Sequence, residues 1–299
     1  MVVRRLRSGA GPGRLAADAR MPMIARVRPG QGLGAPRMAE PGVMELLERT
    51  MGFRPVPGTL NVLLEHSFER PAGTEYVAAG RLSHDWAAAT GQAGYWLIPI
   101  LVGGRYEAMA VQADEPGYPP EQLELVCDVR LRDALDLADG DPVELIVLPR
   151  PADDARWIAG AVIHDGSGRV FLQRRSADRD LFPGAWDIVG GHLEPGERLI
   201  QALRREVAEE TGWRLRRVVD DLGLTTYAGE DDAERHEADY LVEVDGDLAA
   251  PRIEEHLHLD PRWVERSGAM ALLDGTHRSD ALLRPVIERA FELLARAAR

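Results

Sequence analysis

The chain has 299 residues, enough for two domains of ordinary size, and its 45% hydrophobic and 28% charged residues exclude a disordered or fibrous protein. The formal net charge of -13 at pH 7 argues against broad nucleic-acid binding, which requires many Lys and Arg side chains against phosphates. No apolar run approaches the roughly 20 residues of a membrane span, and the single cysteine, Cys127, excludes an internal disulfide. We therefore expect a cytoplasmic protein without nucleic-acid or membrane partners.

Residues 1–23 are rich in Arg, Gly and Ala and lack the apolar core of a signal peptide. This composition predicts a disordered basic arm. The arm could contact phosphates, or it could be an extension upstream of a later start at Met21 or Met23. The first folded domain is then expected over residues 24–149.

Residues 24–149 contain short apolar runs, TLNVLLE, YWLIPILV and ELIVLP, separated by Gly and Pro turns, with one helix expected over VMELLERTM. This order predicts a small β-rich domain. A glycine loop precedes the helix, and its backbone amides could cradle phosphate or only turn the chain. In PGTLN, Thr59 and Asn61 are two residues apart, so on a strand both face one side and offer neutral oxygen ligands. An ordinary turn entering a strand is the alternative.

Glycine loop, helix, GFRPVPGTLN, a tyrosine-proline turn, LELV and LRDALDLADGD follow one another in an order that resembles the archaeal-type, CTP-dependent riboflavin kinase domain. The resemblance implies a six-stranded β-barrel that phosphorylates riboflavin to FMN with CTP. It also implies that Thr59 and Asn61 bind magnesium and that Glu124 takes the proton of the flavin's ribityl hydroxyl. The glycines implied to contact the nucleotide phosphates are Gly30, Gly32 and Gly34.

Two stretches depart from that family's pattern. EPGYPP places Glu115 and Pro116 before Tyr118, where the family usually has a basic residue and a threonine, and AAGRLSHDWAAATGQAG fits poorly to a Gly/Phe-rich flavin-contacting loop. These departures favour the alternative that the barrel is a nucleotide- or flavin-binding regulatory module without kinase activity.

Residues 141–156 run from an apolar, strand-like stretch into a Pro-broken polar stretch, which is typical of a linker, and we place the linker at residues 150–156. A second domain is expected over residues 157–299. WIAGAVIHD and RVFLQRR flank GSG and predict a hairpin. A strand around DYLVEV and a helix from about Asp280 to Ala298 complete a mixed α and β order.

The stretch GGHLEPGERLIQALRREVAEETGW, residues 190–213, predicts a helix with crowded carboxylates. Glu206, Glu209 and Glu210 stand at i, i+3 and i+4 on one face, at the margin of an apolar stripe. Crowded carboxylates there are costly unless a cation offsets them, and such oxygen ligands suit Mg²⁺ or Mn²⁺. Arg205 can steady one carboxylate across a helical turn. A salt-bridged surface helix is the alternative.

The spacing from Gly191 through Glu197 to the run Arg205–Trp213 fits every fixed position of the Nudix box, so the second half resembles that family. The resemblance implies an α/β/α sandwich that hydrolyses a nucleoside diphosphate-linked compound, such as FAD, ADP-ribose or a nucleoside triphosphate. Glu206, Glu209 and Glu210 are implied to be the metal ligands, Arg205 orients them, Glu197 braces the loop, and Gly190 and Gly191 line the nucleotide site.

Many relatives add a further acid from a loop before a tryptophan. Here Glu255 is the nearest candidate, and Glu254 and Asp260 compete with it. Tyr227 in TTYAGEDD is the one aromatic residue near the box that we single out as a substrate contact, with a core or surface role as the alternative.

Overall fold

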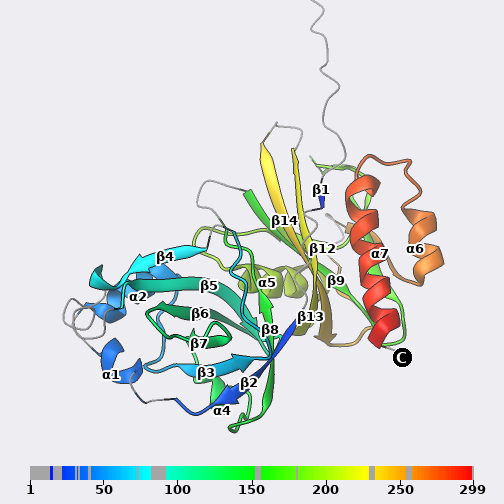
Figure 1. Cartoon of the computed structure of the whole chain (residues 1–299). Helices are drawn as coiled ribbons and strands as arrows, with labels where there is room; N and C mark the ends of the chain where they lie inside the picture. Colours follow the sequence, from blue (N-terminus) through cyan, green and yellow to red (C-terminus); the bar gives the residue numbers. More distant parts are fainter. Residues whose placement is uncertain are drawn as a thin grey trace, which may run out of the picture. The chain divides into compact units, whose positions relative to one another are not determined.

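In the computed structural model the chain forms two compact units, Arg20–Arg150 and Met1–Ala19 with Pro151–Arg299 (Figure 1). Within the described residues, no helix is both long enough and apolar enough to span a membrane. Of the expected basic arm, only β1 (Arg14–Leu15) and residues 22–23 are described, and β1 pairs with a strand of the second unit. The described residues are 14–15, 22–30, 32, 34–39, 42–72, 74–81, 92–151, 156–179, 181–228, 233–253 and 258–297.

The first unit is a closed barrel of six antiparallel strands, which confirms the expected β-barrel. The strands follow the order β5-β6-β7-β3-β2-β8, and β8 pairs back with β5 to close the sheet. A short strand, β4 (Glu75–Ala78), extends the sheet at β5. The barrel strands are β2 (Met23–Arg28), β3 (Leu60–Leu64), β5 (Gly94–Val102), β6 (Tyr106–Asp114), β7 (Gln122–Cys127) and β8 (Pro142–Val147).

Inward-facing side chains, which alternate with outward-facing ones along each strand, fill the barrel. In β3 every second residue is buried, and these residues join inward-facing residues of the other barrel strands in one core that includes Cys127. The helix α2 (Val43–Met51) packs through its apolar face against a second cluster outside this core. Left-handed glycines bound it at both ends, Gly42 and Gly52. The shorter helices are α1 (Gly34–Met38), η1 (Ala79–Arg81) and α4 (Leu131–Ala134).

The second unit is an α/β/α sandwich, as the sequence resemblance implied. Its main sheet has the order β1-β13-β14-β9-β12, with β14 and β9 parallel, and its smaller sheet has the order β11-β10-β15. The main-sheet strands are β9 (Arg156–Ile163), β12 (Val189–His192), β13 (Arg214–Ala228) and β14 (Glu234–Asp245). The small-sheet strands are β10 (Val170–Arg175), β11 (Trp186–Asp187) and β15 (His258–Val264).

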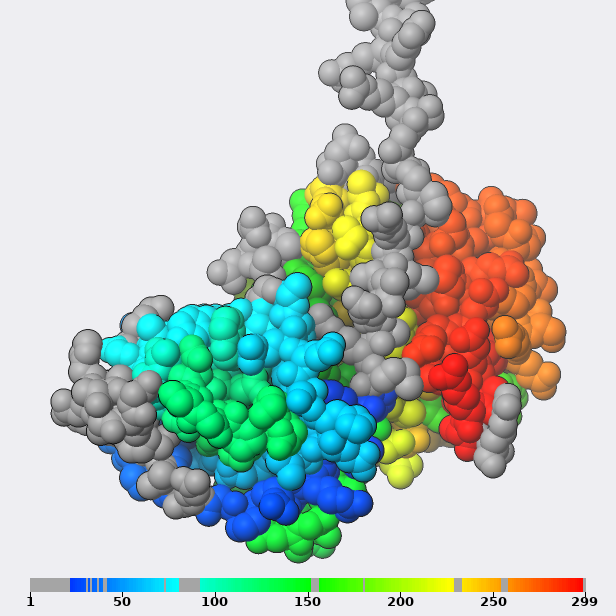
Figure 2. Space-filling view, viewed as in Figure 1, coloured from blue at the N-terminus to red at the C-terminus, as the bar shows by residue number. Residues whose placement is uncertain are grey.

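Helices cover both faces of the main sheet. The glutamate-rich helix α5 (Leu199–Thr211) packs on one face and ends at Gly212, whose left-handed backbone donates to the carbonyl of Ala208. The C-terminal helix α7 (Asp280–Ala297) buries its apolar side against the opposite face, and α6 (Arg266–Leu272) packs beside it. In the space-filling view, α6 and α7 form one continuous orange and red surface (Figure 2).

The expected hairpin of WIAGAVIHD with RVFLQRR is wrong. The two strands share one isolated bridge, between His164 and Val170, and then separate into different sheets. β9 lies between β14 and β12, and all of its residues after Arg156 are buried. A strand covered by helices on both faces is apolar without alternation, and such strands are usually paired with partners distant in sequence.

Candidate active site

Arg205 lies at the centre of the carboxylate cluster on α5. Its guanidinium donates to both carboxylate oxygens of Glu197, at 3.0 and 2.8 Å, to Glu206 Oε1 at 2.6 Å and to Glu209 Oε2 at 3.1 Å. It also donates to the carbonyl of His192 at 3.0 Å, which joins the helix to β12. The hydrogen bond from Arg205 holds the pKa of Glu197 below its ordinary value. One cation therefore organises three of the four box glutamates.

Gly191 admits the carboxylate of Glu206 against the backbone of β12. A side chain at this position would overlap Glu206. Glu206 is buried, and burial raises the pKa of its carboxyl above the ordinary value, with Glu209 adding to the rise and Arg205 opposing it. Glycine at this position therefore lets the strand backbone and the acidic helix meet without an intervening side chain.

Glu210 faces the interior and connects α5 to the small sheet. Its Oε2 accepts from Gln173 Nε2 at 2.6 Å and from the backbone N–H of Gly190 at 3.3 Å, and its Oε1 lies 3.5 Å from His258 Nε2. Burial raises the pKa of Glu210 well above its ordinary value, and the charge of Glu206 adds to this. The three acids thus differ sharply in environment, since the side chain of Glu209 is 53% exposed.

The donor set fits a divalent cation, although the acids are not gathered around one point. In the described ranges, no three His, Cys, Asp or Glu side chains enclose a metal-sized position. Arg205 engages Oε1 of Glu206 and Oε2 of Glu209, and no described residue is hydrogen-bonded to the second oxygen of either carboxylate. Two carboxylate oxygens on adjacent turns, next to a glycine backbone, are ligands that Mg²⁺ accepts.

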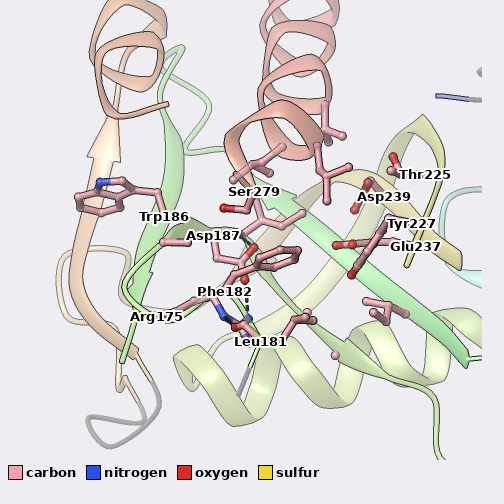
Figure 3. Close-up of a pocket in the computed structure, with 18 of the residues that line it drawn as sticks. Arg175, Leu181, Phe182, Trp186, Asp187, Thr225, Tyr227, Glu237, Asp239 and Ser279 are labelled. Atoms are coloured by element: carbon pink, nitrogen blue, oxygen red, sulfur yellow. Dashed lines mark hydrogen bonds and ion pairs between the residues drawn. The ribbon is translucent and has the colours of Figure 1, made fainter. Parts of the chain in front are cut away.

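A pocket opens on the opposite face of the main sheet from α5, with a cavity volume of about 90 Å³ (Figure 3). Its wall includes carboxyl groups of Asp187, Glu237 and Asp239, which the sequence pattern did not single out, and Tyr227, which it did. Asp187 accepts from Arg175 at 2.7 Å. Burial raises the pKa of Glu237 to about 7, and burial together with Glu237 raises that of Asp239 well above its ordinary value. Glu237 and Asp239 lie in the charged first half of β14, ERHEADY, where their i, i+2 spacing on one strand face is the only sequence signal for them.

The barrel brings the other predicted residues together. Thr59 Oγ1 donates to Glu124 Oε2 at 3.2 Å, and Asn61 Nδ2 donates to Thr59 Oγ1 at 3.4 Å. Asn61 and Glu124 are register partners on β3 and β7. Added side chains at Gly30 and Gly34 would press on Asn61 and Thr59, so the glycine loop lies directly over these residues. The third glycine of the loop, Gly32, has a left-handed backbone with φ 73° and open space around it.

These barrel residues suit a hydrated cation beside phosphate, because they combine two neutral oxygens with one carboxylate. Tyr118, in the EPGYPP turn, lies near Glu124, and burial followed by the charge of Glu124 raises the pKa of its hydroxyl. A cavity of about 130 Å³ opens beside Thr59, between the PGT turn and residues 127–133.

Of the three candidates for a further acid near Trp263, the structure describes one. Glu254 and Glu255 lie outside the described residues. Asp260 is described, has a left-handed backbone with φ 51°, and forms an exposed two-point ion pair with Arg262. Asp260 therefore already has a cationic partner on its own strand.

Comparison with known proteins gives matches to both units. Residues 154–284 match the model of the NUDIX domain, and residues 27–147 match the model abbreviated as a CTP-dependent riboflavin kinase and described as a domain of unknown function, DUF120. The nucleoside triphosphatase NudI of Enterobacter sp. (strain 638) is 41% identical over 73 residues, which are 22% of this chain and 52% of that protein. The riboflavin kinase of Thermofilum pendens is 34% identical over 127 residues, 40% of this chain and 56% of that protein.

The chain thus spans about half the length of the curated relatives that it matches. Among solved structures, a MutT protein from Methanosarcina mazei Go1 is 23% identical with a TM-score of 0.39, over 50% of this chain and 99% of that one. A NUDIX hydrolase from Nitrosomonas europaea is 23% identical with a TM-score of 0.39, over 46% and 88% of the two chains. The chain therefore combines a Nudix domain at residues 154–284 with a domain of the CTP-dependent riboflavin kinase family at residues 27–147.

Proposed function

We propose that the Nudix domain hydrolyses a phosphoric anhydride bond in a nucleoside diphosphate-linked compound with Mg²⁺ or Mn²⁺. The observation that carries this proposal is the Arg205-centred carboxylate cluster, in which Glu206 lies against the backbone of Gly191. The similarity to a nucleoside triphosphatase makes nucleoside triphosphates the first substrates to test, followed by ADP-ribose and FAD.

The residues of α5 have different roles in the proposed reaction. A bound divalent ion supplies charge neutralisation on the bridging phosphates and a more acidic water. Arg205 holds the carboxylates of Glu206 and Glu209 side by side and cancels part of their repulsion. The exposed Glu209 can accept the proton of the attacking water while the water oxygen bonds to phosphorus. The bridging P–O bond then breaks, and its electron pair leaves with the departing phosphate.

Metal removal tests this proposal directly. Hydrolysis of nucleoside triphosphates, ADP-ribose or FAD in Mg²⁺ should fall at least about a hundredfold in excess EDTA. Without the divalent ion, nothing offsets the negative charges of the carboxylates and of the diphosphate. Product chromatography measures the released nucleotide, and re-addition of Mg²⁺ should restore it. Undiminished cleavage in EDTA, or no cleavage of any of these compounds in Mg²⁺, contradicts the proposal.

For the barrel, we propose CTP-dependent phosphorylation of riboflavin to FMN. Its support is the contact chain from Asn61 through Thr59 to Glu124, under the glycine loop. Glu124 would accept the proton of the ribityl hydroxyl, and the loop amides would bind the phosphates. A second candidate, a regulatory module that binds nucleotide or flavin without phosphoryl transfer, is favoured by the acidic EPGYPP turn.

The substitution Asn61→Ala tests the barrel's activity. FMN formation from riboflavin and CTP should fall at least about a hundredfold, because an oxygen ligand for magnesium is lost. Fluorescence after chromatography separates FMN from riboflavin, and Asn61→Asp, which keeps an oxygen ligand, should retain much more activity. Tight riboflavin or CTP binding by the wild type without any FMN would instead establish the regulatory module.

A further inference from the structure

Four arginines and a histidine lie at one end of this pocket, although the chain as a whole has a net charge of -13. We name them the basic cluster, and its members are Arg156, Arg175, Arg179, His192 and Arg235. Arg175, Arg179 and His192 line the pocket itself. The other two arginines are brought beside them by the pairing of strands in the main sheet.

The strand register places Arg156 and Arg235 on the pocket face of the main sheet. Arg156 on β9 and Arg235 on β14 are register partners. Each lies two residues before a residue that lines the pocket, which is Ile158 on β9 and Glu237 on β14. Ile158 is also the register partner of His192 on β12. Because residues two apart on a strand face the same side, the two arginines lie one row beyond His192.

The positive charges of the basic cluster act on one another. Burial lowers the pKa of His192, and the charges of all four arginines lower it further. Arg175 has a counter-charge, because it is paired with Asp187 at 2.7 Å (Figure 3). Arg179 is half-buried, and its side chain forms no hydrogen bond or ion pair with any residue that the structure describes. Like charges held this close are unfavourable, so an anion at this end of the pocket would be stabilised.

The acids of the same pocket lie farther along the sheet and are partly neutralised. On one face of β14, Arg235 is followed by Glu237 and then by Asp239. Burial raises the pKa of Glu237 to about 7 and that of Asp239 well above its ordinary value. Near neutral pH these carboxyls are therefore partly protonated, and they repel an anion at the basic cluster less than ionised carboxylates would.

The basic cluster adjoins the carboxylates of α5 through β12. His192 directly follows Gly191, whose backbone lies against Glu206, and the carbonyl of His192 accepts from Arg205 at 3.0 Å. In the proposed reaction, the divalent ion offsets the two phosphates that flank the cleaved bond. A third phosphate is repelled by the glutamates of α5, whereas at the basic cluster it meets positive charge.

We propose that the basic cluster binds a third phosphate group of the substrate, with Arg179 and His192 as its donors, and that the Nudix domain therefore favours nucleoside triphosphates. This inference rests on the proposed hydrolase and specifies its substrate class. The guanidinium of Arg179 donates charge-assisted hydrogen bonds to the phosphate oxygens. ADP-ribose and FAD have a ribosyl or ribityl group where a nucleoside triphosphate has its third phosphate, so they leave the basic cluster without an anion.

Two uncleavable nucleotides that differ by one phosphate test the proposal. They are the ADP and ATP analogues in which methylene groups replace every bridging oxygen between phosphates, and their adenine base differs from that of the CTP proposed for the barrel. In calorimetry on the full chain with Mg²⁺, we expect the ATP analogue to bind at least about tenfold tighter than the ADP analogue. Arg179→Ala should remove most of this preference, and Arg179→Lys, which keeps the charge, should retain part of it. The control Arg214→Ala, an exposed arginine on β13 that does not line the pocket, should keep all of it.

Equal affinities for the two analogues, no binding of either at millimolar concentration, or a preference that survives Arg179→Ala overturns the proposal. If Arg179→Ala does not fold, as judged by circular dichroism, His192→Ala provides the same comparison. Hydrolysis of ATP and ADP-ribose in Mg²⁺ separates the two proposals. Cleavage of both with equal kcat/KM, unchanged by Arg179→Ala, refutes only the phosphate site, whereas a binding preference without cleavage of any nucleotide refutes only the hydrolase.

Discussion

Replacing Glu209 with glutamine should lower kcat/KM for hydrolysis by about a thousandfold, equivalent to about 4 kcal/mol of transition-state stabilisation. Glu209 provides a carboxylate oxygen beside that of Glu206 and is the most accessible proton acceptor on α5. Glutamine keeps the size of the side chain but loses the charge and the basicity. The measurement is steady-state kinetics on whichever nucleotide the wild type cleaves.

The free energy of unfolding should hardly change in this variant, so a loss of activity would not result from unfolding. The side chain of Glu209 is 53% exposed, and exposed ion pairs such as that with Arg205 contribute only about 0 to 1 kcal/mol. The matched control is Glu292→Gln, an exposed glutamate on α7, which should leave kinetics unchanged. Activity of Glu209→Gln within tenfold of the wild type would place proton transfer and metal binding elsewhere.

Glu237→Gln should stabilise the Nudix domain above neutral pH. The pKa of Glu237 is about 7 in the folded protein, raised mainly by burial and by the charge of Asp187, against an ordinary value of 4.5. A raised carboxyl pKa contributes stability that is fully present below pH 4.5 and is lost as pH rises through 7. The full shift corresponds to about 3 kcal/mol, and contact with solvent through the pocket reduces it to about 2 kcal/mol.

Denaturant unfolding at pH 5 and pH 8 measures this effect. The variant should match the wild type near pH 5 and exceed it by about 2 kcal/mol at pH 8, because glutamine does not ionise. The control Asp245→Asn lies on the same strand with an exposed side chain paired to Arg214, and it should show no pH-dependent difference. A variant that is less stable than the wild type at pH 8 would contradict the assignment of Glu237 as a buried, destabilising acid.

The two acids of β14 thus resemble functional residues in their energetics. Burial disfavours the charged forms of Glu237 and Asp239, so it raises the pKa of both carboxyls. The charge of Asp187 raises both further, and the charge of Glu237 adds to the rise for Asp239. A chain under no functional constraint would be more stable with apolar residues at these positions. Both acids line the pocket that Gly190 also lines.

Local spacing alone is enough to identify the helix and its acids. Residues three and four apart share a helical face, so the sequence groups Glu206, Glu209 and Glu210 without any knowledge of the tertiary fold. The contact of Arg205 with Glu209 at 3.1 Å is of this local kind. The β-barrel and the α/β/α sandwich could be predicted from the order of the motifs along the chain. Each motif marks one turn or the start of one strand in the fold of the family that the sequence resembles.

Tertiary structure alone decided which residues from distant strands meet. Asp187, Thr225 and Asp239 come from β11, β13 and β14, and sequence spacing says nothing about strand order or which face is covered. The same reason explains the failed hairpin, since the apolar run of β9 is compatible with either a hairpin or a central strand. Gln173 and His258 meet Glu210 only because the small sheet packs beside α5. The sequence by itself therefore determined the helical acids and the fold class, whereas pairing between distant strands created the pocket.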